Sequence, residues 1–432
     1  MRRPHPRSRT PAARHARFAW GGAATVASIG LVACSSSAPG AASVDAGRTI
    51  DARADGPVAD VVNRDAVHEA SRALDSAAGA DHDATPDGSP CPSSESDPAN
   101  CGACGHDCHG AACVGGMCQP VILASGQDNP LWIALDATNV YWVSGGPGEP
   151  GVTADGSLRS VPIAGGSPVT LASNLEAPST LVVDSTTVYW VNAGTAATDY
   201  ADGTVVKMPL AGGAITTLST SPSRFTGIAR DGANVYWADG LSGGGVVVAV
   251  PLGGGPAVTL ASAQGPVYEL VAVSGDVFCE ASPANSVAET ITKLPVAAGT
   301  PVALASNQLY AQGLAVDGSS VYWATEELFV DGGVLDVGQI LTVPKAGGLP
   351  VTLATQQTSP SALAVDGSSI YWVSYASNGA ILKMPLTGGA IVTLASGQSF
   401  AQSLAVDDTY IYWSTLDDST GQPPGTIVRL AK

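Results

Sequence analysis

The chain has 432 residues, with 51 glycines, 30 prolines and only 13% charged residues, a composition that favours many turns over long helices. The formal net charge is −18; residues 1–33 contain six arginines and no acid, so the remaining 13 basic and 37 acidic residues give −24. Because phosphate binding needs lysine- and arginine-rich surfaces, the composition excludes nucleic acid as a partner.

The first 33 residues predict a signal peptide. Six arginines precede an apolar run over 20–33, which is too short for a membrane-spanning helix and suits the hydrophobic region of an export signal. The run ends in Leu-Val-Ala-Cys, which resembles a bacterial lipobox. That resemblance implies lipidation of Cys34 and an exported protein, anchored by lipid in the cell envelope at the outer membrane or cell surface. An ordinary signal peptide with a chance cysteine is the alternative.

Residues 34–90 predict a disordered linker that begins at Cys34. The segment is rich in Ala, Asp, Ser and Gly and contains no aromatic residue. Such a composition cannot bury enough apolar surface to offset the entropy of folding. We therefore expect this stretch to act as a tether between the lipid anchor and the rest of the chain.

Residues 91–118 form a short segment rich in cysteine and glycine. Its six cysteines are Cys91, Cys101, Cys104, Cys108, Cys113 and Cys118. An even number in a small exported segment predicts a disulfide module, with the pairing left open. The alternative is a zinc knuckle, whose spacing is approached by Cys101, Cys104, His109 and Cys113, with His106 beside them. The segment resembles the Cys-rich repeats of stigma-specific plant proteins, which also occur on many myxobacterial lipoproteins, and this implies an accessory module.

From residue 119 to the end the sequence repeats about every 45 residues. A Tyr-Trp pair recurs at 141–142, 189–190, 236–237, 322–323, 371–372 and 412–413, and Phe278-Cys279 stands in a seventh, degenerate copy. Five residues before each of the six tyrosines is an aspartate: Asp136, Asp184, Asp231, Asp317, Asp366 and Asp407. Self-similarity at such a period indicates repeated supersecondary units.

Each repeat predicts four short strands. An apolar strand, a tight turn of the Asp-Gly-Ser-Ser type, an aromatic strand, an alternating strand and a final Pro-Val-Thr-Leu-Ala-Ser strand follow in order. The sequence thus predicts an all-β fold: a seven-bladed β-propeller of four-stranded antiparallel blades over 119–432. The last repeat lacks its fourth strand, and 120–127 supplies an orphan copy that would complete the blade and close the ring. The Tyr-Trp and Asp positions resemble those of YWTD and NHL-type propellers.

The repeated residues predict structure. Tyr and Trp would pack between neighbouring blades, and each aspartate would accept backbone hydrogen bonds in its turn. We expect no cofactor, with calcium at these aspartates as the alternative left open.

Binding is therefore expected in the non-repeated loops after the second and fourth strands, which share one face. Candidate ligand-binding residues at the rim of the central channel are Trp132, Arg224, Phe225, Tyr268, Glu269, Tyr310, Gln312, Phe400 and Gln402. Aromatic platforms beside amides and an arginine would suit a glycan or a peptide.

The propeller region contains no histidine and one cysteine, Cys279. This removes Ser-His-Asp and Cys-His catalysis and histidine-bound zinc from residues 119–432. The sequence favours a non-catalytic module that binds a glycan, a peptide or a protein. The alternative is an enzyme that uses carboxylates, such as a glycosidase, a lyase or a calcium-dependent lactonase, with Glu269 as the one inward candidate.

Overall fold

The computed structural model describes residues 95–145, 155–194, 202–220, 225–239, 245–262, 264–282, 288–297, 299–326, 328–330, 333–336, 338–416 and 425–432. The predicted signal peptide, the lipidation site Cys34, the predicted linker and Cys91 lie outside these residues. Within the described part of the chain, no helix has the length and hydropathy of a membrane-spanning segment.

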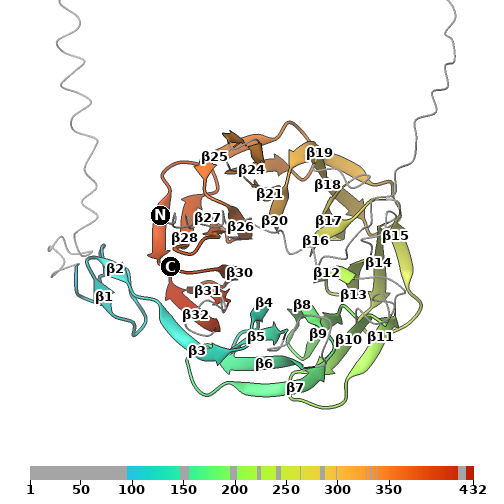
Figure 1. Ribbon diagram of the computed structural model, residues 1–432, viewed down its shortest axis with the longest axis horizontal. Helices are drawn as coiled ribbons and strands as arrows, with labels where there is room; N and C mark the ends of the chain where they lie inside the picture. Colours follow the sequence, from blue (N-terminus) through green and yellow to red (C-terminus); the bar gives the residue numbers. More distant parts are fainter. Residues whose placement is uncertain are drawn as a thin grey trace, which may run out of the picture. The chain divides into compact units, whose positions relative to one another are not determined.

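Seven four-stranded antiparallel sheets form the blades of a β-propeller (Figure 1), which confirms the predicted fold. Six blades run outward from the channel in chain order: β4 (Pro130–Leu135), β5 (Asn139–Ser144), β6 (Gly156–Pro162), β7 (Val169–Leu175); β8 (Pro178–Val183), β9 (Thr187–Asn192), β10 (Thr204–Pro209), β11 (Thr216–Thr220); β12 (Phe225–Arg230), β13 (Asn234–Asp239), β14 (Val246–Pro251), β15 (Val258–Ala261); β16 (Val267–Val273), β17 (Asp276–Ala281), β18 (Ala288–Pro295), β19 (Val302–Leu309); β20 (Ala311–Val316), β21 (Ser320–Thr325), β24 (Gly338–Pro344), β25 (Val351–Gln357); β26 (Pro360–Val365), β27 (Ser369–Ser374), β28 (Ala380–Pro385), β29 (Val392–Ser396). We number the blades 1 to 7 in this order.

Blade 7 joins the two ends of the propeller sequence. Its inner three strands are β30 (Ala401–Val406), β31 (Tyr410–Thr415) and β32 (Gly425–Ala431), and its outer strand is β3 (Val121–Gln127). In the register of β3 with β32, Val121 lies opposite Arg429 and Gln127 lies opposite Gly425. The orphan strand therefore completes the last blade as predicted, and it covers an edge that would otherwise be unpaired.

The core consists of seven apolar clusters, one at each interface between blades. In five of these clusters the Tyr of one blade packs with the Trp of the next, as Tyr322 does with Trp372 and Tyr371 with Trp413. The ring closes in the same way, because Tyr412 of blade 7 shares a cluster with Trp142 of blade 1. The degenerate repeat keeps the pattern: Cys279 faces Tyr236, and Phe278 faces Trp323. The predicted role of Tyr-Trp is confirmed.

Each repeated aspartate holds its turn with both carboxylate oxygens. In blade 5, Asp317 Oδ1 accepts hydrogen bonds from the backbone N–H groups of Ser319 and Ser320, both at 2.7 Å. Its Oδ2 accepts a hydrogen bond from the Tyr322 hydroxyl at 2.9 Å. The same Asp-Tyr bond occurs in the other five complete repeats. The turn and the aromatic strand are therefore linked by side chains.

A glutamine at the end of the outer strand adds a polar link between blades. Gln308 in β19 accepts a hydrogen bond from Trp323 Nε1 at 3.1 Å, and Gln398, just after β29, accepts one from Trp413 Nε1 at 3.0 Å. The amide of each glutamine donates to the carbonyl two residues earlier. The Nε1 atoms of Trp142 and Trp372 have no hydrogen-bond partner among the described residues.

The Cys-rich segment is a disulfide module with a two-stranded sheet, β1 (Cys113–Val114) and β2 (Met117–Cys118). Its disulfides include Cys101–Cys113 and Cys108–Cys118, and Cys104 is also disulfide-bonded. The zinc-knuckle alternative is therefore wrong, because its three cysteines are not thiolates. His106 instead lies 2.6 Å from the Cys101 carbonyl, and the His109 ring contacts that of Tyr410 in blade 7 at a centroid distance of 5.5 Å.

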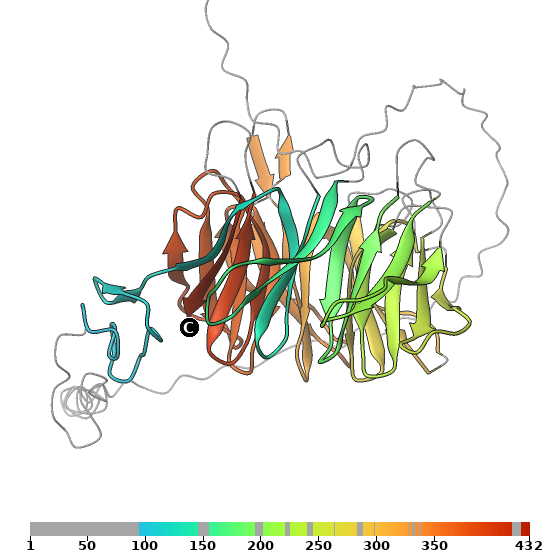
Figure 2. The same ribbon diagram turned by 90° about the horizontal axis from the view of Figure 1, so that it is seen from below.

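The two faces of the propeller differ. Figure 2 shows the hairpin of β22 (Leu328–Val330) and β23 (Gly333–Asp336) projecting from one face, beyond the ends of the blade strands. This hairpin belongs to the connection between the second and third strands of blade 5. On the opposite face the turns are short and uniform and carry the repeated aspartates. The second strand of every blade ends, and the third strand begins, on the face from which the hairpin projects.

Candidate functional site

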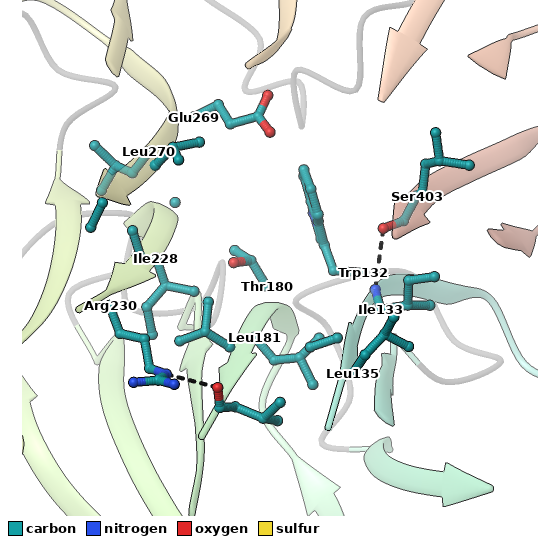
Figure 3. A pocket seen from close by; sticks show the side chains of 18 of the residues that line it. Trp132, Ile133, Leu135, Thr180, Leu181, Ile228, Arg230, Glu269, Leu270 and Ser403 are labelled. Atoms are coloured by element: carbon teal, nitrogen blue, oxygen red, sulfur yellow. Dashed lines mark hydrogen bonds between the residues drawn. The ribbon is translucent and has the colours of Figure 1, made fainter. Parts of the chain in front are cut away.

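The centre of the ring contains a cavity of about 370 Å³. The innermost strands of six blades line it: β4, β8, β12, β16, β26 and β30. Its wall is mostly leucine, isoleucine and valine, with a few polar groups and one tryptophan (Figure 3). A mainly apolar cavity with a few convergent polar groups is the usual form of a ligand site in proteins.

At one position of the inner strand the residue type differs from blade to blade. It is the residue just before the one that pairs with the Trp position of the second strand. Thr180 precedes Leu181, which pairs with Trp190, and Glu269 precedes Leu270, which pairs with Cys279. By the same register, blades 1, 3 and 7 have Trp132, Gly227 and Ser403 at this position. The surrounding repeat is nearly uniform, so the channel wall differs from blade to blade mainly at this position.

Trp132 and Glu269 come from blades 1 and 4 and both project into the central space (Figure 3). Trp132 is partly exposed, whereas Thr180 and Ser403 are buried. Ser403 Oγ accepts a hydrogen bond from the backbone N–H of Ile133 at 3.2 Å, which joins blade 7 to blade 1. Of these three side chains, Trp132 is therefore the one that remains accessible to a ligand.

Glu269 is held by the neighbouring blade. Its Oε2 accepts a hydrogen bond from the backbone N–H of Leu314 at 2.9 Å, and the N–H of Gly313 also donates to this carboxylate. Desolvation by burial raises the pKa of Glu269 to about 7, because it outweighs the two backbone donors, which favour the ionised form. A carboxyl with this pKa can accept or donate a hydrogen bond near neutral pH.

Arg230 is a cavity residue that the sequence did not single out. It is the last residue of β12, three residues beyond Gly227 and thus about 10 Å further along the channel. Its Nε donates to the Val183 carbonyl at 2.7 Å and its Nη1 to the Asp231 carbonyl at 3.0 Å. These bonds tie blade 3 to blade 2 and direct the guanidinium toward the backbone, away from the Glu269 end.

The predicted site residues separate into two groups. Trp132, Tyr268 and Glu269 line the cavity, whereas Tyr310, Gln312, Phe400 and Gln402 do not. The Gln312 amide donates to Glu326 Oε2 at 2.9 Å, at the start of the connection that carries the β22–β23 hairpin. Arg224 lies outside the described residues, and of Phe225 only the backbone, at the start of β12, is described.

Tyr310 and Phe400 occupy equivalent places just before an inner strand, both with positive φ, 46° and 50°. This left-handed region is uncommon for large side chains. The Phe400 ring contacts that of Tyr375 in a T-shaped arrangement at a centroid distance of 5.6 Å. Phe400 therefore packs against a residue of blade 6 and does not form part of the cavity wall.

Thr180, Ser403 and Arg230 are cavity residues that sequence reasoning missed. Thr180 and Ser403 occupy the same inner-strand position as Trp132 and Glu269, whereas Arg230 lies deeper, at the end of β12. A comparison of the inner strands position by position would have found Thr180 and Ser403, because most of the repeated residues there are apolar. The bulges near the start of these strands shift the register and obscure that comparison.

The class that fold and site define is a seven-bladed β-propeller with a ligand-sized cavity at its axis. No family model matches this chain, and no curated protein matches it. Among solved structures, a chain in the "Crystal structure of Nidogen/Laminin Complex" is similar at 18% identity, with a TM-score of 0.41; the match covers 54% of this chain and 88% of that chain.

Proposed function

We propose that the chain is an exported, lipid-anchored binding protein of the cell envelope. Its propeller would hold a glycan, peptide or protein ligand on the face where the variable connections emerge, and the axial cavity would receive one end of that ligand. The Arg-rich start, the lipobox-like sequence ending in Cys34 and the disulfides Cys101–Cys113 and Cys108–Cys118 support export.

The observation that carries this proposal is the variation at one inner-strand position. A packed repeat needs only an apolar or small residue there, yet the chain places Trp132, Thr180 and Glu269 at this position in a cavity of about 370 Å³. An indole offers a flat apolar face, and a carboxyl and hydroxyls accept or donate hydrogen bonds. This combination suits a sugar ring or a peptide side chain that has an apolar face and polar edges.

A carboxylate enzyme is supported less well. Glycoside hydrolysis uses two carboxyl groups about 5–10 Å apart on either side of the bond that is cleaved. Among the residues that the structure describes, Glu269 is the one acidic residue in the cavity wall. Its carboxylate also accepts hydrogen bonds from the inner strand of blade 5, so Glu269 helps to hold blades 4 and 5 together.

The test is a binding screen with the full chain, purified in its oxidised form as the Cys34→Ser variant so that no lipid is attached. We expect specific binding on a glycan array or a peptide array, with and without added CaCl2. Trp132→Ala should lose the bound features, while Asp408→Asn, a change at an exposed position in a turn of the opposite face, should keep them. Turnover of an array substrate that a Glu269→Gln variant abolishes would instead support the enzyme.

Lipidation has its own test. The intact chain, produced in a bacterium that processes lipoproteins, should partition with membranes and carry acyl chains at Cys34 by mass spectrometry. Cys34→Ser should release it into the soluble fraction. Cleavage at another position, with Cys34 absent from the mature protein or unmodified, would contradict the anchor without affecting the binding proposal.

A further inference from the structure

The axial cavity contains both an indole and a carboxylate that a ligand can reach. Trp132 in β4 and Glu269 in β16 occupy the same register position in blades 1 and 4. Figure 3 shows both side chains extending into the central space. Both are partly exposed there, although the cavity is narrow. A ligand group that fills this cavity of about 370 Å³ therefore meets the two side chains together.

This pair of side chains is suited to a cation. The face of a tryptophan ring attracts an ammonium or guanidinium group more strongly than the ring of tyrosine or phenylalanine does. A carboxylate attracts the same groups by charge and accepts hydrogen bonds from them, which are stronger than those between neutral groups. A neutral ligand would contact the indole but would gain little from the charge of Glu269.

The basic residue of the cavity wall is engaged elsewhere. Arg230 lies about 10 Å along β12 from Gly227, the residue of blade 3 at the register position of Glu269. Its guanidinium donates to the backbone carbonyls of Val183 and Asp231, and it interacts with the Asp231 carboxylate by charge. The negative charge of Glu269 is therefore left for a ligand, without an arginine beside it.

The surroundings of Glu269 add negative charge. Gln312, two residues before Leu314 in β20, donates to Glu326 Oε2 at 2.9 Å, and Leu314 donates to Glu269. Two carboxylates are thus bound to neighbouring positions of one strand. Residues 34–432 contain 13 basic and 37 acidic residues, a net charge of −24. Negative potential at a cleft draws cationic ligands toward it and raises their association rate.

The hydrogen bonds of Glu269 favour an ammonium over a guanidinium. The Leu314 N–H donates to Oε2 at 2.9 Å, and the Gly313 N–H donates to the same carboxylate. An arginine side chain binds a carboxylate best when both oxygens are open to its two parallel N–H groups. An ammonium is a compact charge that needs one free acceptor position. The carboxylate is therefore better matched to a primary amine.

The rest of the wall favours an aliphatic chain behind the charge. It consists mainly of leucine, isoleucine, valine and alanine, and Ser403 Oγ already accepts a hydrogen bond from the Ile133 N–H. A sugar ring would bury hydroxyl groups here with few partners, which costs free energy. Methylene groups gain free energy by leaving water for such a wall. The volume, near the lower end of the range of about 300–1,000 Å³ for ligand sites, suits a single side chain.

We propose that the axial cavity binds the side chain of a lysine presented by a peptide or protein partner. The indole of Trp132 and the carboxylate of Glu269 hold its ammonium, and its methylene groups lie along the apolar wall. This assignment rests on the proposed function, because it names the ligand class of the same cavity. The lysine enters from the face with the β22–β23 hairpin, because both side chains lie near the start of inner strands that begin on that face.

The experiment uses the full oxidised chain as its Cys34→Ser variant and the peptide acetyl-Gly-Gly-Lys-Gly-Gly-amide. Ligand-observed NMR measures Kd values even for weak binding. Peptides with Nε-acetyl-lysine or norleucine in place of the lysine should bind at least about tenfold more weakly, because they lack the charge. The arginine peptide should also bind more weakly than the lysine peptide. Equal affinity for the lysine and norleucine peptides would overturn the proposal.

Glucosamine oligomers test the source of the ammonium. They carry the same charged group on a sugar ring, whose hydroxyl groups would need partners in the cavity. We expect them to bind more weakly than the lysine peptide. Tighter binding of the oligomers than of the lysine peptide would overturn the assignment to lysine.

Variants of the two side chains locate the site. Glu269→Gln should weaken binding of the lysine peptide at least about tenfold while retaining an oxygen for the Leu314 N–H. Trp132→Leu keeps an apolar side chain but removes the ring face, and it should weaken binding about threefold or more. Asp408→Asn removes one negative charge at an exposed position in a turn of the opposite face and should bind as the parent chain does. Unchanged affinity in Glu269→Gln would overturn the site.

The pH dependence of binding is a test on the parent chain that needs no variant. An ammonium binds the ionised form of Glu269, and burial raises the pKa of this carboxyl to about 7. A lysine ammonium stays charged up to about pH 10. Affinity for the lysine peptide should therefore increase about tenfold from pH 6 to pH 8. Constant or decreasing affinity over this range would overturn the proposal.

Other charged groups lie near Glu269, and a comparison with Glu269→Gln separates their effects. Glu280 pairs with Glu269 from β17, Glu326 follows β21, and Arg230 is at the far end of β12. The inner strand of blade 5, Ala311–Val316, contains no titratable side chain. Affinity in Glu269→Gln should vary little between pH 6 and 8. The same increase in this variant as in the parent chain would assign the titration to another group and overturn the role of Glu269.

The outcomes separate the lysine assignment from the binding function on which it rests. A neutral or acidic array feature that Trp132→Ala no longer binds, with no binding of the lysine peptide up to about 10 mM, would overturn the lysine assignment and leave the binding function intact. No binding of any array feature and none of the lysine peptide would contradict both.

Discussion

The Tyr322 hydroxyl donates to Asp317 Oδ2 at 2.9 Å, and through this bond a turn on one face of the propeller is tied to an aromatic side chain between two blades. Tyr322 is almost fully buried against Trp372 of blade 6. The recurring Asp and Tyr-Trp are therefore parts of one structural unit. This unit repeats around the ring and leaves ligand recognition to residues that do not repeat.

Asp317→Ala should destabilise the propeller by about 2–4 kcal/mol, because it removes two backbone hydrogen bonds and leaves the buried Tyr322 hydroxyl without its acceptor. Asp408→Ala is the matched control, because Asp408 is exposed in the equivalent turn of blade 7. It should change stability by less than about 0.5 kcal/mol. Chemical denaturation followed by tryptophan fluorescence measures both. Equal unfolding midpoints for the two variants would contradict the role given to Asp317.

The same aspartates predict a loss of stability in acid. Burial opposes ionisation of Asp317, but hydrogen bonds from two backbone N–H groups, Tyr322 and Ser319 outweigh it and lower its pKa below the ordinary value of 3.8. A carboxyl with a lowered pKa in the folded state stabilises the fold above the unfolded pKa. That contribution should disappear as the pH falls below about 4. Asp317→Ala should show a weaker decline in this range than the parent chain.

The glutamine link offers a comparison within one molecule. Gln308→Ala should cost about 1–3 kcal/mol, because it leaves Trp323 Nε1 buried without an acceptor. Gln357→Ala is the matched control, since it removes a similar outer-strand glutamine while Trp372 Nε1 already has no partner among the described residues. Thermal unfolding should separate the two variants. A cost for Gln357→Ala as large as that for Gln308→Ala would show that the Trp323 bond adds nothing.

The raised pKa of Glu269 predicts that its contribution to folding stability depends on pH with the opposite sign. Its pKa is raised from 4.5 to about 7 in the folded state, so between these values the folded chain binds more protons than the unfolded chain. Stability contributed by this group is complete below pH 4.5 and is lost as the pH rises through 7. Because the side chain keeps some access to the channel, we expect a loss of about 1–3 kcal/mol.

Glu269→Gln should remove that dependence while retaining an oxygen that can accept from the Leu314 N–H. Its unfolding free energy should therefore vary little between pH 5 and 8, apart from slopes shared with the parent chain. Denaturant titrations at several pH values measure this. The same slope in Glu269→Gln and in the parent chain would assign the titration to another group.

Cys279 should be unreactive in the folded chain. It is 0% exposed, and burial raises the pKa of its thiol to about 12, so that the thiolate is negligible at neutral pH. Under non-reducing conditions a thiol reagent should label it only after denaturant is added, and mass spectrometry locates the modified residue. Rapid labelling of Cys279 at pH 8 in the native chain would contradict its place between blades 3 and 4.

Much of this fold can be predicted from the sequence because the repeat occurs in seven copies. The Tyr-Trp spacing predicts the interfaces, and the orphan strand over 120–127 predicts how β3 closes on β32. Even the degenerate copy is placed correctly, since Phe278 and Cys279 occupy the Tyr and Trp positions. Periodicity identifies what every blade shares, but it carries less information on a position that differs in each blade.

The cavity shows this limit. Trp132, Tyr268 and Glu269 could be predicted as channel residues because they follow the loops after the fourth strand. Thr180 and Ser403 share the register position of Trp132, but bulges near the start of the inner strands obscure the comparison that would reveal this. Arg230 lies at the far end of β12, away from the loops after the fourth strands. The buried acids Glu280 and Glu289 have no signature in the sequence: they look like ordinary charges near strand ends, and only the structure shows that they are 3% and 0% exposed.

The central claim, that the axial cavity binds the ligand through Trp132, is tested most directly by affinity. For the strongest feature found on the glycan and peptide arrays, isothermal titration would give Kd values for the oxidised chain, Trp132→Ala and Asp408→Asn, the last at an exposed position in a turn of the opposite face. We predict that Trp132→Ala weakens binding about tenfold or more, the loss of one aromatic platform, and that Asp408→Asn leaves it unchanged. Equal affinities in all three proteins, or no binding on either array, would contradict the account.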